Sequence, residues 1–66
     1  MKTPIQQAVE IAGGQTQLAR LLGVSQPRVF NWLKKNKVTP QFVIAIEQHT
    51  GISRHDLRPD VYPRET

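Results

Sequence analysis

Residues 15–33 constrain the fold most, because they hold two short helical patterns joined by a glycine at a fixed distance from a small residue. Gly23 falls four residues after Ala19, which suits two crossing helices that need a small side chain on one and a tight reversal between them. Val29 and Trp32 then give the second pattern an apolar face. This layout is typical of a helix-turn-helix, whose second helix lies in the major groove of DNA with its N-terminal residues at the base edges. An ordinary helical corner is the alternative that the layout alone leaves open.

Positive charge is concentrated on the same part of the chain. Residues 15–37 contain no acidic residue and five basic ones, Arg20, Arg28, Lys34, Lys35 and Lys37. The whole chain has nine Lys and Arg and five Asp and Glu. The residues outside 15–37 therefore carry the other four basic residues, nine minus the five named above, together with all five acidic residues. A solvated basic face is the ordinary explanation of a lysine pair. A cation cluster over a helix-turn-helix, however, is the electrostatic footprint expected of a nucleic-acid-binding protein.

The 66 residues are enough for one small domain. A chain of this length buries only about 60% of its unfolded surface, which leaves little room for an enclosed active site. It has no cysteine, so neither a disulfide nor a thiolate metal site can support the core, and we expect no metal and no cofactor. We also expect neither a signal peptide nor a membrane span, and therefore a cytoplasmic protein without a membrane partner.

Capping residues, prolines and glycines divide the chain into short helices. A Thr-Pro pair opens a helix both at Thr3 and at Thr39, because a hydroxyl N-cap and a proline in the first turn suit a helix start. Glycines and Asn36 are placed to end helices in a left-handed conformation. The predicted helices cover about residues 4–12, 15–22, 26–35, 40–50 and 53–58.

No window of useful length alternates apolar and polar residues with period two, so no sheet is predicted. The expected fold class is all-α, a compact bundle of four to five short helices that contains the helix-turn-helix. We expect residues 1–58 to form the DNA-binding domain. Residues 59–66, with two prolines and three further charged residues after Pro59, are expected to form an extended C-terminal tail that takes part in a dimer contact.

Ser25 is expected to cap, through its hydroxyl, a helix that exposes polar side chains in its first turns, where a recognition helix meets DNA. Gln and Asn can hold adenine through two hydrogen bonds, and Arg can hold guanine in the same way. A proline is tolerated there because the N–H groups of a first turn have no partner inside the helix, and its ring is suited to contact a thymine methyl group. Simple solvent exposure is the alternative for all of them. We predict base-reading roles for Gln26, Pro27, Arg28 and Asn31.

A second set of residues is expected to bind the phosphate backbone. Gln15 begins a helix, where its side chain or the helix N-terminus is suited to hold a phosphate, although capping alone would explain it as well. The predicted phosphate-binding residues are Gln15, Thr16, Gln17, Ser25, Lys34, Lys35 and Lys37.

The two aromatic residues of this segment have different expected roles. Trp32 lies three residues after Val29 on the inward face, so we place it in the core. Phe30 points elsewhere on the helix and cannot fully join the same cluster. Two positions stay open for Phe30, packing against the helix that starts at Pro40 or against a partner subunit.

The segment from Gln15 to Trp32 resembles the small phage Cro repressors and the related prophage-encoded YdaS-type regulators. The resemblance extends from about Ile5 to Pro63, and its further motifs are Ala45-Ile46-Glu47, Thr50-Gly51 and Asp56-Leu57-Arg58-Pro59-Asp60. It implies a lambda-repressor-like DNA-binding fold and a small homodimer that binds a pseudo-palindromic operator in double-stranded DNA and represses transcription in a bacterial or phage-infected cell.

One segment departs from this family pattern. Residues 36–40 read Asn-Lys-Val-Thr-Pro, where comparable relatives often carry Gly and a shorter Val-Pro step, so the path between the third and fourth helices is not fixed by the resemblance. Some Cro proteins replace the C-terminal helices by a hairpin. The capped, helix-period pattern of residues 40–57 favours the all-helical version.

A dimer is expected because one recognition helix reads only a few base pairs. The C-terminal region is the surface left for that contact, since the helix-turn-helix must face DNA. The predicted interface residues are Phe42, Ile52, Val61 and Tyr62, with Ile44 as a further candidate. For Tyr62, packing inside its own subunit over the first helix is the alternative.

The same residues leave two rival functions open. We do not expect an enzyme, because Ser53, His55 and Asp56 are better explained as a helix cap and its neighbours, and because His49 and His55 are spaced poorly for a helical metal site. The second rival is a DNA-binding antitoxin that also binds a toxin. No extra segment for wrapping a toxin is visible, since only seven residues follow Pro59, and a toxin partner is therefore unsupported.

Overall fold

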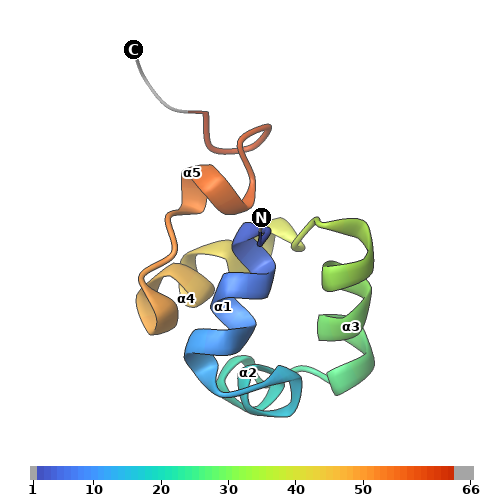
Figure 1. The fold of residues 1–66 in the computed structure, drawn as a ribbon. Coiled ribbons are helices and arrows are strands. Elements are labelled where there is room, and N and C mark those ends of the chain that lie inside the picture. The colour runs from blue at the N-terminus through green and yellow to red at the C-terminus, as the bar shows by residue number, and fades with distance from the viewer. Residues whose placement is uncertain (1, 64–66) are drawn as a thin grey trace.

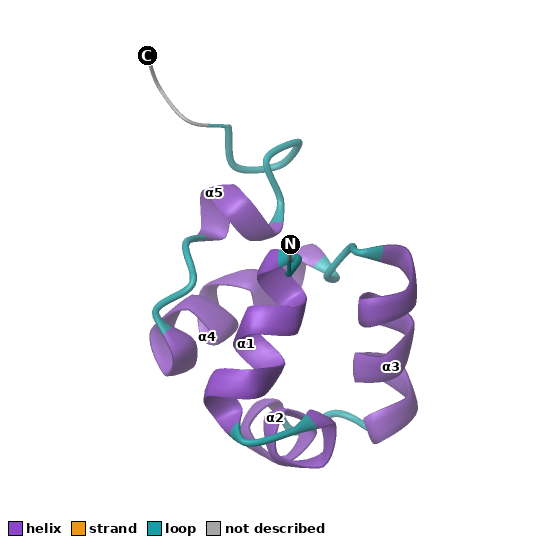
Figure 2. Ribbon diagram, viewed as in Figure 1, coloured by secondary structure: helices purple, strands orange, loops and turns teal. Residues whose placement is uncertain are grey.

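The computed structural model describes residues 2–63, and these residues form five α-helices and no strand (Figure 1, Figure 2). The helices are α1 (Pro4–Ala12), α2 (Gln15–Leu22), α3 (Gln26–Lys35), α4 (Pro40–Thr50) and α5 (Arg54–Leu57). This confirms the predicted all-α fold with its helix-turn-helix, which is α2, the turn at Gly23 and α3. The helix bounds follow the sequence signals closely because those signals act within one turn of the chain.

Local capping fixes the first and last helices. Thr3 Oγ1 accepts a hydrogen bond from Gln6 N at 3.2 Å, and Gln6 Oε1 accepts one from Thr3 N at 3.0 Å, so α1 begins with a capping box. Ser53 Oγ accepts from His55 N at 3.1 Å at the start of α5. The helix-turn-helix corner is made by Gly23, whose φ of 70° is a left-handed conformation that a residue with a Cβ adopts only at a cost.

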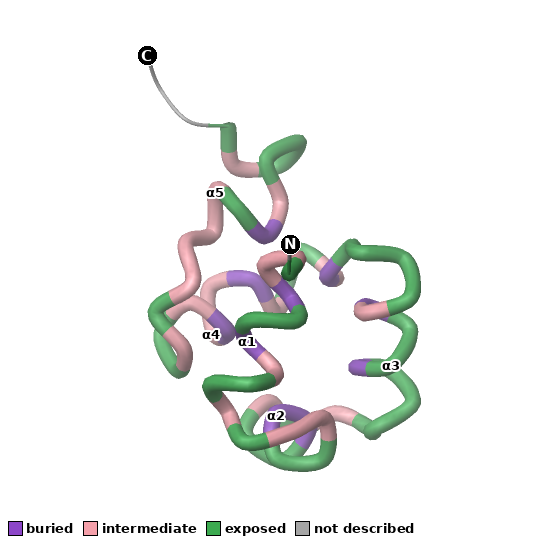
Figure 3. The backbone as a smooth tube through the Cα atoms, viewed as in Figure 1, coloured by how far each residue is buried: buried purple, intermediate pink, exposed green. Residues whose placement is uncertain are grey.

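The hydrophobic core lies where all five helices meet, and α1 contacts each of the other four. Its buried residues are Ile5, Ala8, Leu18, Ala19, Val29, Trp32, Val38, Val43, Ile46 and Leu57. Figure 3 shows that most of α3 is exposed and that its buried positions face the other helices. Val38 and Leu57 were not predicted as core residues, because no helical repeat marks a loop position or a four-residue helix.

The segment between α3 and α4 has a defined path. Asn36 ends α3 with a φ of 52°, as predicted, and Lys37 N donates to Trp32 O at 3.1 Å. Val38 is buried, and Trp32 Nε1 donates to Thr39 Oγ1 at 3.2 Å. The Thr39 hydroxyl accepts this hydrogen bond from the indole and makes no side-chain cap on α4, so the predicted hydroxyl cap at Thr39 is wrong.

The described part of the C-terminal tail is not extended, in contrast to the prediction from its prolines. Val61 N and Tyr62 N both donate to Arg58 O, at 3.1 and 2.8 Å, so the chain turns back after α5. Tyr62 is partly buried against the core, and its carbonyl oxygen lies 2.8 Å from His55 Nδ1. Residues 64–66 of the predicted tail lie outside the described residues.

Candidate nucleic-acid interface

The predicted base-reading residues lie together on the outer side of α3. Val29 and Trp32 turn inward, so the helical repeat directs Pro27 and Asn31 away from the core. All four predicted readers, Gln26, Pro27, Arg28 and Asn31, are exposed. Because α3 forms one edge of the molecule (Figure 1), this face is open to a partner as large as duplex DNA.

A side-chain hydrogen bond joins the two helices of the helix-turn-helix at their N-termini. Gln26 Nε2 donates to Gln15 Oε1 at 2.6 Å, which brings together a predicted base reader and a predicted phosphate-binding residue. This bond uses one of the four hydrogen-bonding positions of the Gln26 amide. Its carbonyl oxygen and second N–H remain for a base edge.

Three helices begin without a side-chain cap, and two of them, α2 and α3, are joined at their starts by the bond between Gln15 and Gln26. Gly14, Ser25 and Thr39 are the N-cap residues of α2, α3 and α4, and none of them makes a cap hydrogen bond through its side chain. Ser25 thus occupies the predicted cap position, but the predicted role of its hydroxyl as the cap is wrong. Helix N-termini with unused N–H groups attract anions. The exposed Ser25 hydroxyl is available for the same purpose, in contrast to the capped starts of α1 and α5.

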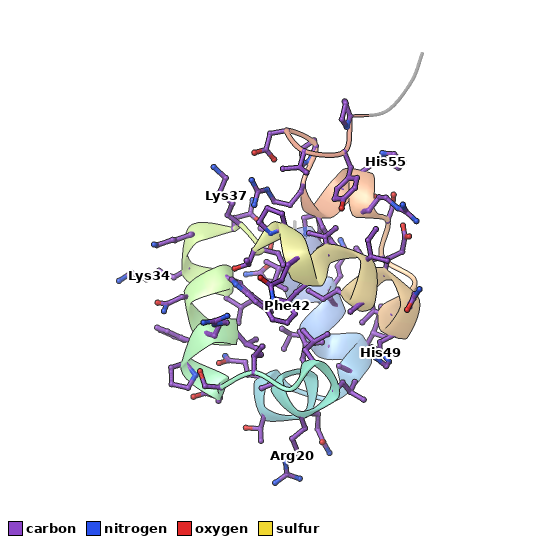
Figure 4. All side chains as sticks on the ribbon, turned by 180° about the vertical axis from the view of Figure 1, so that it is seen from behind. Arg20, Lys34, Lys37, Phe42, His49 and His55 are labelled. Carbon is purple, nitrogen blue, oxygen red and sulfur yellow. The ribbon has the colours of Figure 1, made fainter. Side chains whose placement is uncertain are left out.

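The cations of residues 15–37 form no salt bridge with any acid that the structure describes, although Lys37 is close enough to lower the pKa of the Asp60 carboxyl. The other described cations are all paired, Lys2 with Glu10 at 2.6 Å, Arg54 with Glu47 at 2.8 Å and Arg58 with Asp60 at 2.7 Å. Figure 4 shows Arg20, Lys34 and Lys37 pointing away from the protein. The unpaired charge therefore coincides with the exposed faces of α2 and α3.

Arg28 is held by an aromatic pair behind the reading face. Its Cζ lies 6.0 Å from the centroid of the Phe42 ring, and that ring packs on Trp32 with centroids 5.7 Å apart and an interplanar angle of 44°. A guanidinium over an aromatic face is attracted by the ring quadrupole, so Arg28 has a preferred position without losing its charge.

A basic groove of about 500 Å³ runs between α3 and the start of α4. Its lining residues are Arg28, Asn31, Trp32, Lys35, Lys37, Val38, Thr39, Pro40 and Arg58. Four of these side chains are cationic and none is acidic, so the groove is suited to an anionic group such as a phosphate. The sequence did not assign Arg58 or Thr39 to the site. Only the fold brings Arg58 beside the Val38 carbonyl and the Thr39 hydroxyl beside the Trp32 indole.

Arg58 also links this groove to the C-terminal turn by hydrogen bonds. Its Nη1 donates to Val38 O at 2.6 Å, while Nε and Nη2 donate to the two carboxylate oxygens of Asp60 at 2.9 and 2.7 Å. The hydrogen bonds from Arg58 hold the pKa of the Asp60 carboxyl far below its usual range. Arg58 thus couples the α3–α4 segment to the C-terminal turn.

This pairing predicts an acid-dependent loss of stability. The pKa of Asp60 is lower in the folded protein than the value of about 3.9 expected when unfolded, so its stabilisation is complete above about pH 4 and is lost as the pH falls. We expect Asp60→Asn to make the free energy of unfolding less dependent on pH below about 4, as measured by urea denaturation. Glu10→Gln is the control, since the Lys2–Glu10 pair is exposed. An unchanged acid dependence in Asp60→Asn would contradict the role of the pair.

The four predicted dimer residues differ in how much of each side chain is exposed. Phe42, Ile52 and Tyr62 are partly buried against the core of their own subunit, whereas Val61 is 41% exposed. The Tyr62 ring also lies under Arg54, with Cζ 5.8 Å from the ring centroid. Phe30 is 52% exposed and is not part of the cluster around the core, so it does not pack against α4.

The residues considered for catalysis or metal binding do not assemble into such a site. Ser53 caps α5 as expected, His55 contacts the Tyr62 carbonyl, and Figure 4 shows His49 at a distance from His55. Among residues 2–63 no three His, Cys, Asp or Glu side chains are grouped to hold a metal ion. Within the same residues no helix has the length and apolar character needed to cross a membrane.

Comparison with known proteins identifies the relatives of this chain. The family described as "Bacterial toxin YdaS" matches residues 5–66. The "Putative transcriptional regulator YdaS" of Escherichia coli (strain K12) is 43% identical over 58 residues, which cover 83% of this chain and 59% of that protein. The chain therefore spans less than two thirds of the length of this relative.

The fold has a similar solved structure, the "Cro protein from putative prophage element Xfaso 1 in Xylella fastidiosa strain Ann-1". It superposes with a TM-score of 0.90 at 33% identity over 94% of this chain and 98% of the Cro chain. None of these descriptions names an enzyme, in agreement with the interpretation from the sequence. The match over residues 5–66, together with the sequence and structural relatives, shows that the chain belongs to the YdaS family.

Proposed function

We propose that the protein is a sequence-specific, double-stranded DNA-binding transcription regulator, and that it acts as a Cro-like repressor at a pseudo-palindromic operator. The observation that carries this proposal is the coincidence of an exposed polar recognition helix with cations that have no acidic partner among the described residues. The descriptions of the two relatives as a transcriptional regulator and a Cro protein support it.

In the proposed complex α3 lies in the major groove. Gln26, Arg28 and Asn31 face base edges, with Arg28 on guanine and the two amides on adenine. The lysines at the end of α3 and in the loop that follows lie near the backbone, where their charge displaces condensed counterions. The start of α2, from Gln15 to Gln17, binds a phosphate through side chains and helix N–H groups, and Ser25 does the same for α3.

A nuclease footprint on the DNA that flanks the gene for this chain tests the proposed sequence-specific binding. We expect two protected half-sites about 34 Å, or one helical turn, apart. Binding to unrelated duplex of the same length gives the reference affinity, and the operator should bind at least about 10³-fold more tightly at physiological salt. Equal affinity for both duplexes would overturn sequence-specific regulation.

We propose that the operator is bound by a homodimer. Val61 is the predicted interface residue that remains well exposed, since its three companions are partly buried in their own subunit. In a two-fold contact each substitution acts twice. We expect Val61→Glu to raise the dimer dissociation constant at least about tenfold, because it removes buried apolar area and adds like charges.

Sedimentation of Val61→Glu and its operator affinity should change together. Ile11→Glu is the matched control, since Ile11 is also an exposed apolar residue, but on α1. A Val61→Glu protein that remains a dimer and binds the operator fully would place the interface elsewhere.

The family description as a toxin favours a second candidate function, inhibition of growth. We propose that such toxicity acts through DNA binding by the cations of α2 and α3, which form no salt bridge with a described acid. Growth of cells that express wild type or Arg28→Ala tests this, and toxicity that survives the substitution would contradict it. The antitoxin alternative has less support, since the family name describes a toxin and supplies no partner.

A further inference from the structure

Phe30 is a large apolar side chain exposed on the recognition helix. It is 52% exposed, and it lies outside the cluster of buried and partly buried residues that makes the core. Burying a phenylalanine side chain favours folding by about 1.5–3 kcal/mol, so a protein of this size gains nothing within its own fold from leaving it outside. The Phe42 ring shows the contrast, since it is packed between Trp32 and Arg28.

Helical spacing places Phe30 on the face that the proposed function turns toward DNA. Pro27 precedes it by three residues and Lys34 follows it by four, so the three side chains are neighbours on one exposed stripe. Asn31 lies beside them, and Gln26, one turn earlier, is the residue linked to Gln15. The apolar group is therefore framed by polar side chains and by a cation that has no salt bridge to a described acid, which suits a nucleic acid rather than an apolar protein surface.

The major groove offers one apolar feature, the 5-methyl group of thymine. We propose that Phe30 and Pro27 form an apolar pair that reads thymine methyl groups, and that Phe30 thereby determines part of the operator specificity. This inference rests on the proposed DNA-binding function. Three residues of α-helix rise about 4.5 Å, which lies between one and two of the 3.4 Å steps between stacked bases, so the two rings are spaced to contact nearby base pairs. The expected half-site then carries thymines within one or two base steps of each other, next to the positions read by the polar side chains.

The test replaces each thymine of the footprinted operator by uracil. Uracil lacks only the 5-methyl group and keeps the hydrogen-bonding edge, so the exchange isolates the apolar contact. At the position that Phe30 contacts we expect wild-type affinity to fall about fourfold for one half-site and about 16-fold when both half-sites are changed, from the transfer value for one buried carbon. Phe30→Ala should bind the thymine operator at least about 16-fold more weakly than wild type does, because both half-sites lose the contact. Its affinity for the uracil operator should equal its affinity for the thymine operator.

Ile11→Ala is the matched control, since it also truncates an exposed apolar side chain but on α1, and it should leave both affinities unchanged. Phe30→Leu keeps an apolar group at the position and should retain part of the methyl discrimination. The unfolding midpoint of Phe30→Ala should stay near that of wild type, because the side chain is not in the core.

The outcomes separate this inference from the proposed function. Absence of any footprint would overturn both. Specific binding with no thymine sensitive to uracil, or with equal sensitivity in wild type and Phe30→Ala, would overturn the role of Phe30 and leave the regulator intact. Dissociation of Phe30→Ala into monomers with unchanged methyl discrimination would assign Phe30 to a subunit contact instead.

Discussion

We expect the affinity for the operator to fall about 10³-fold between 50 and 200 mM monovalent salt. Lys34, Lys35 and Lys37 form no salt bridge with a described acid, so a dimer brings about six of these charges to the phosphates. Each neutralised phosphate adds about −0.9 to the slope of log affinity against log salt, which gives a slope of about −5 for six of them. The uncapped starts of α2 and α3 and Arg20 would steepen it further.

Substitution of single lysines measures how much each lysine contributes to this slope. Lys35→Ala should make the slope shallower by about two units per dimer and weaken all duplex sequences to a similar degree. Lys2→Ala is the control, since Lys2 lies outside the interface and is already paired with Glu10. A flat salt titration of wild type would contradict a nucleic-acid function, and an equal change in Lys2→Ala would show that net charge alone is measured.

The second large effect is expected for Arg28→Ala on the operator. Arg28 is the one cation of the predicted base-reading set, and its guanidinium is positioned over Phe42 beside Asn31. Loss of a two-bond contact to guanine should cost about 1–3 kcal/mol, or about 5–150-fold in affinity, at each half-site. The preference for one base pair per half-site should disappear, as measured by competition among operators that differ at that position.

Lys34→Ala is the matched comparison for Arg28→Ala, since it removes one charge from the same helix without removing a predicted reader. It should weaken operator and random DNA alike. The stability of Arg28→Ala should change little, because an exposed cation–π contact contributes only about 0.5–1 kcal/mol. If Arg28→Ala lost equal affinity on random DNA, Arg28 would be a phosphate contact and not a base reader.

Much of the fold could be predicted from the sequence because its signals are local. Thr3 with Pro4, Gly23 and Asn36 each act within one turn of helix, and the structure has a helix start, a sharp corner and a left-handed stop at these places. The exposed position of the predicted base readers followed from the same logic, since a helix that buries Val29 and Trp32 has only one face left for them.

The predictions that failed concern side chains whose partners lie elsewhere in the chain. The Ser25 hydroxyl does not cap α3, and the described part of the tail turns back where an extended chain was predicted. The predicted subunit contact of Phe42 stays a prediction, and its ring is partly buried against Trp32 and under Arg28. Each of these outcomes depends on contacts that no local pattern specifies.

The sequence by itself therefore determined the helices, the corner of the helix-turn-helix and the concentration of charge on one segment, because these depend on neighbours within about one helical turn. Only the tertiary structure decided how the surface is assembled. The Gln15–Gln26 bond joins residues 11 apart, and the bond from Arg58 to the Val38 carbonyl joins residues 20 apart and fixes the groove beside α3. Such pairs form only after the core has brought the helices together, since burial of apolar area, and not local backbone preference, sets their distance.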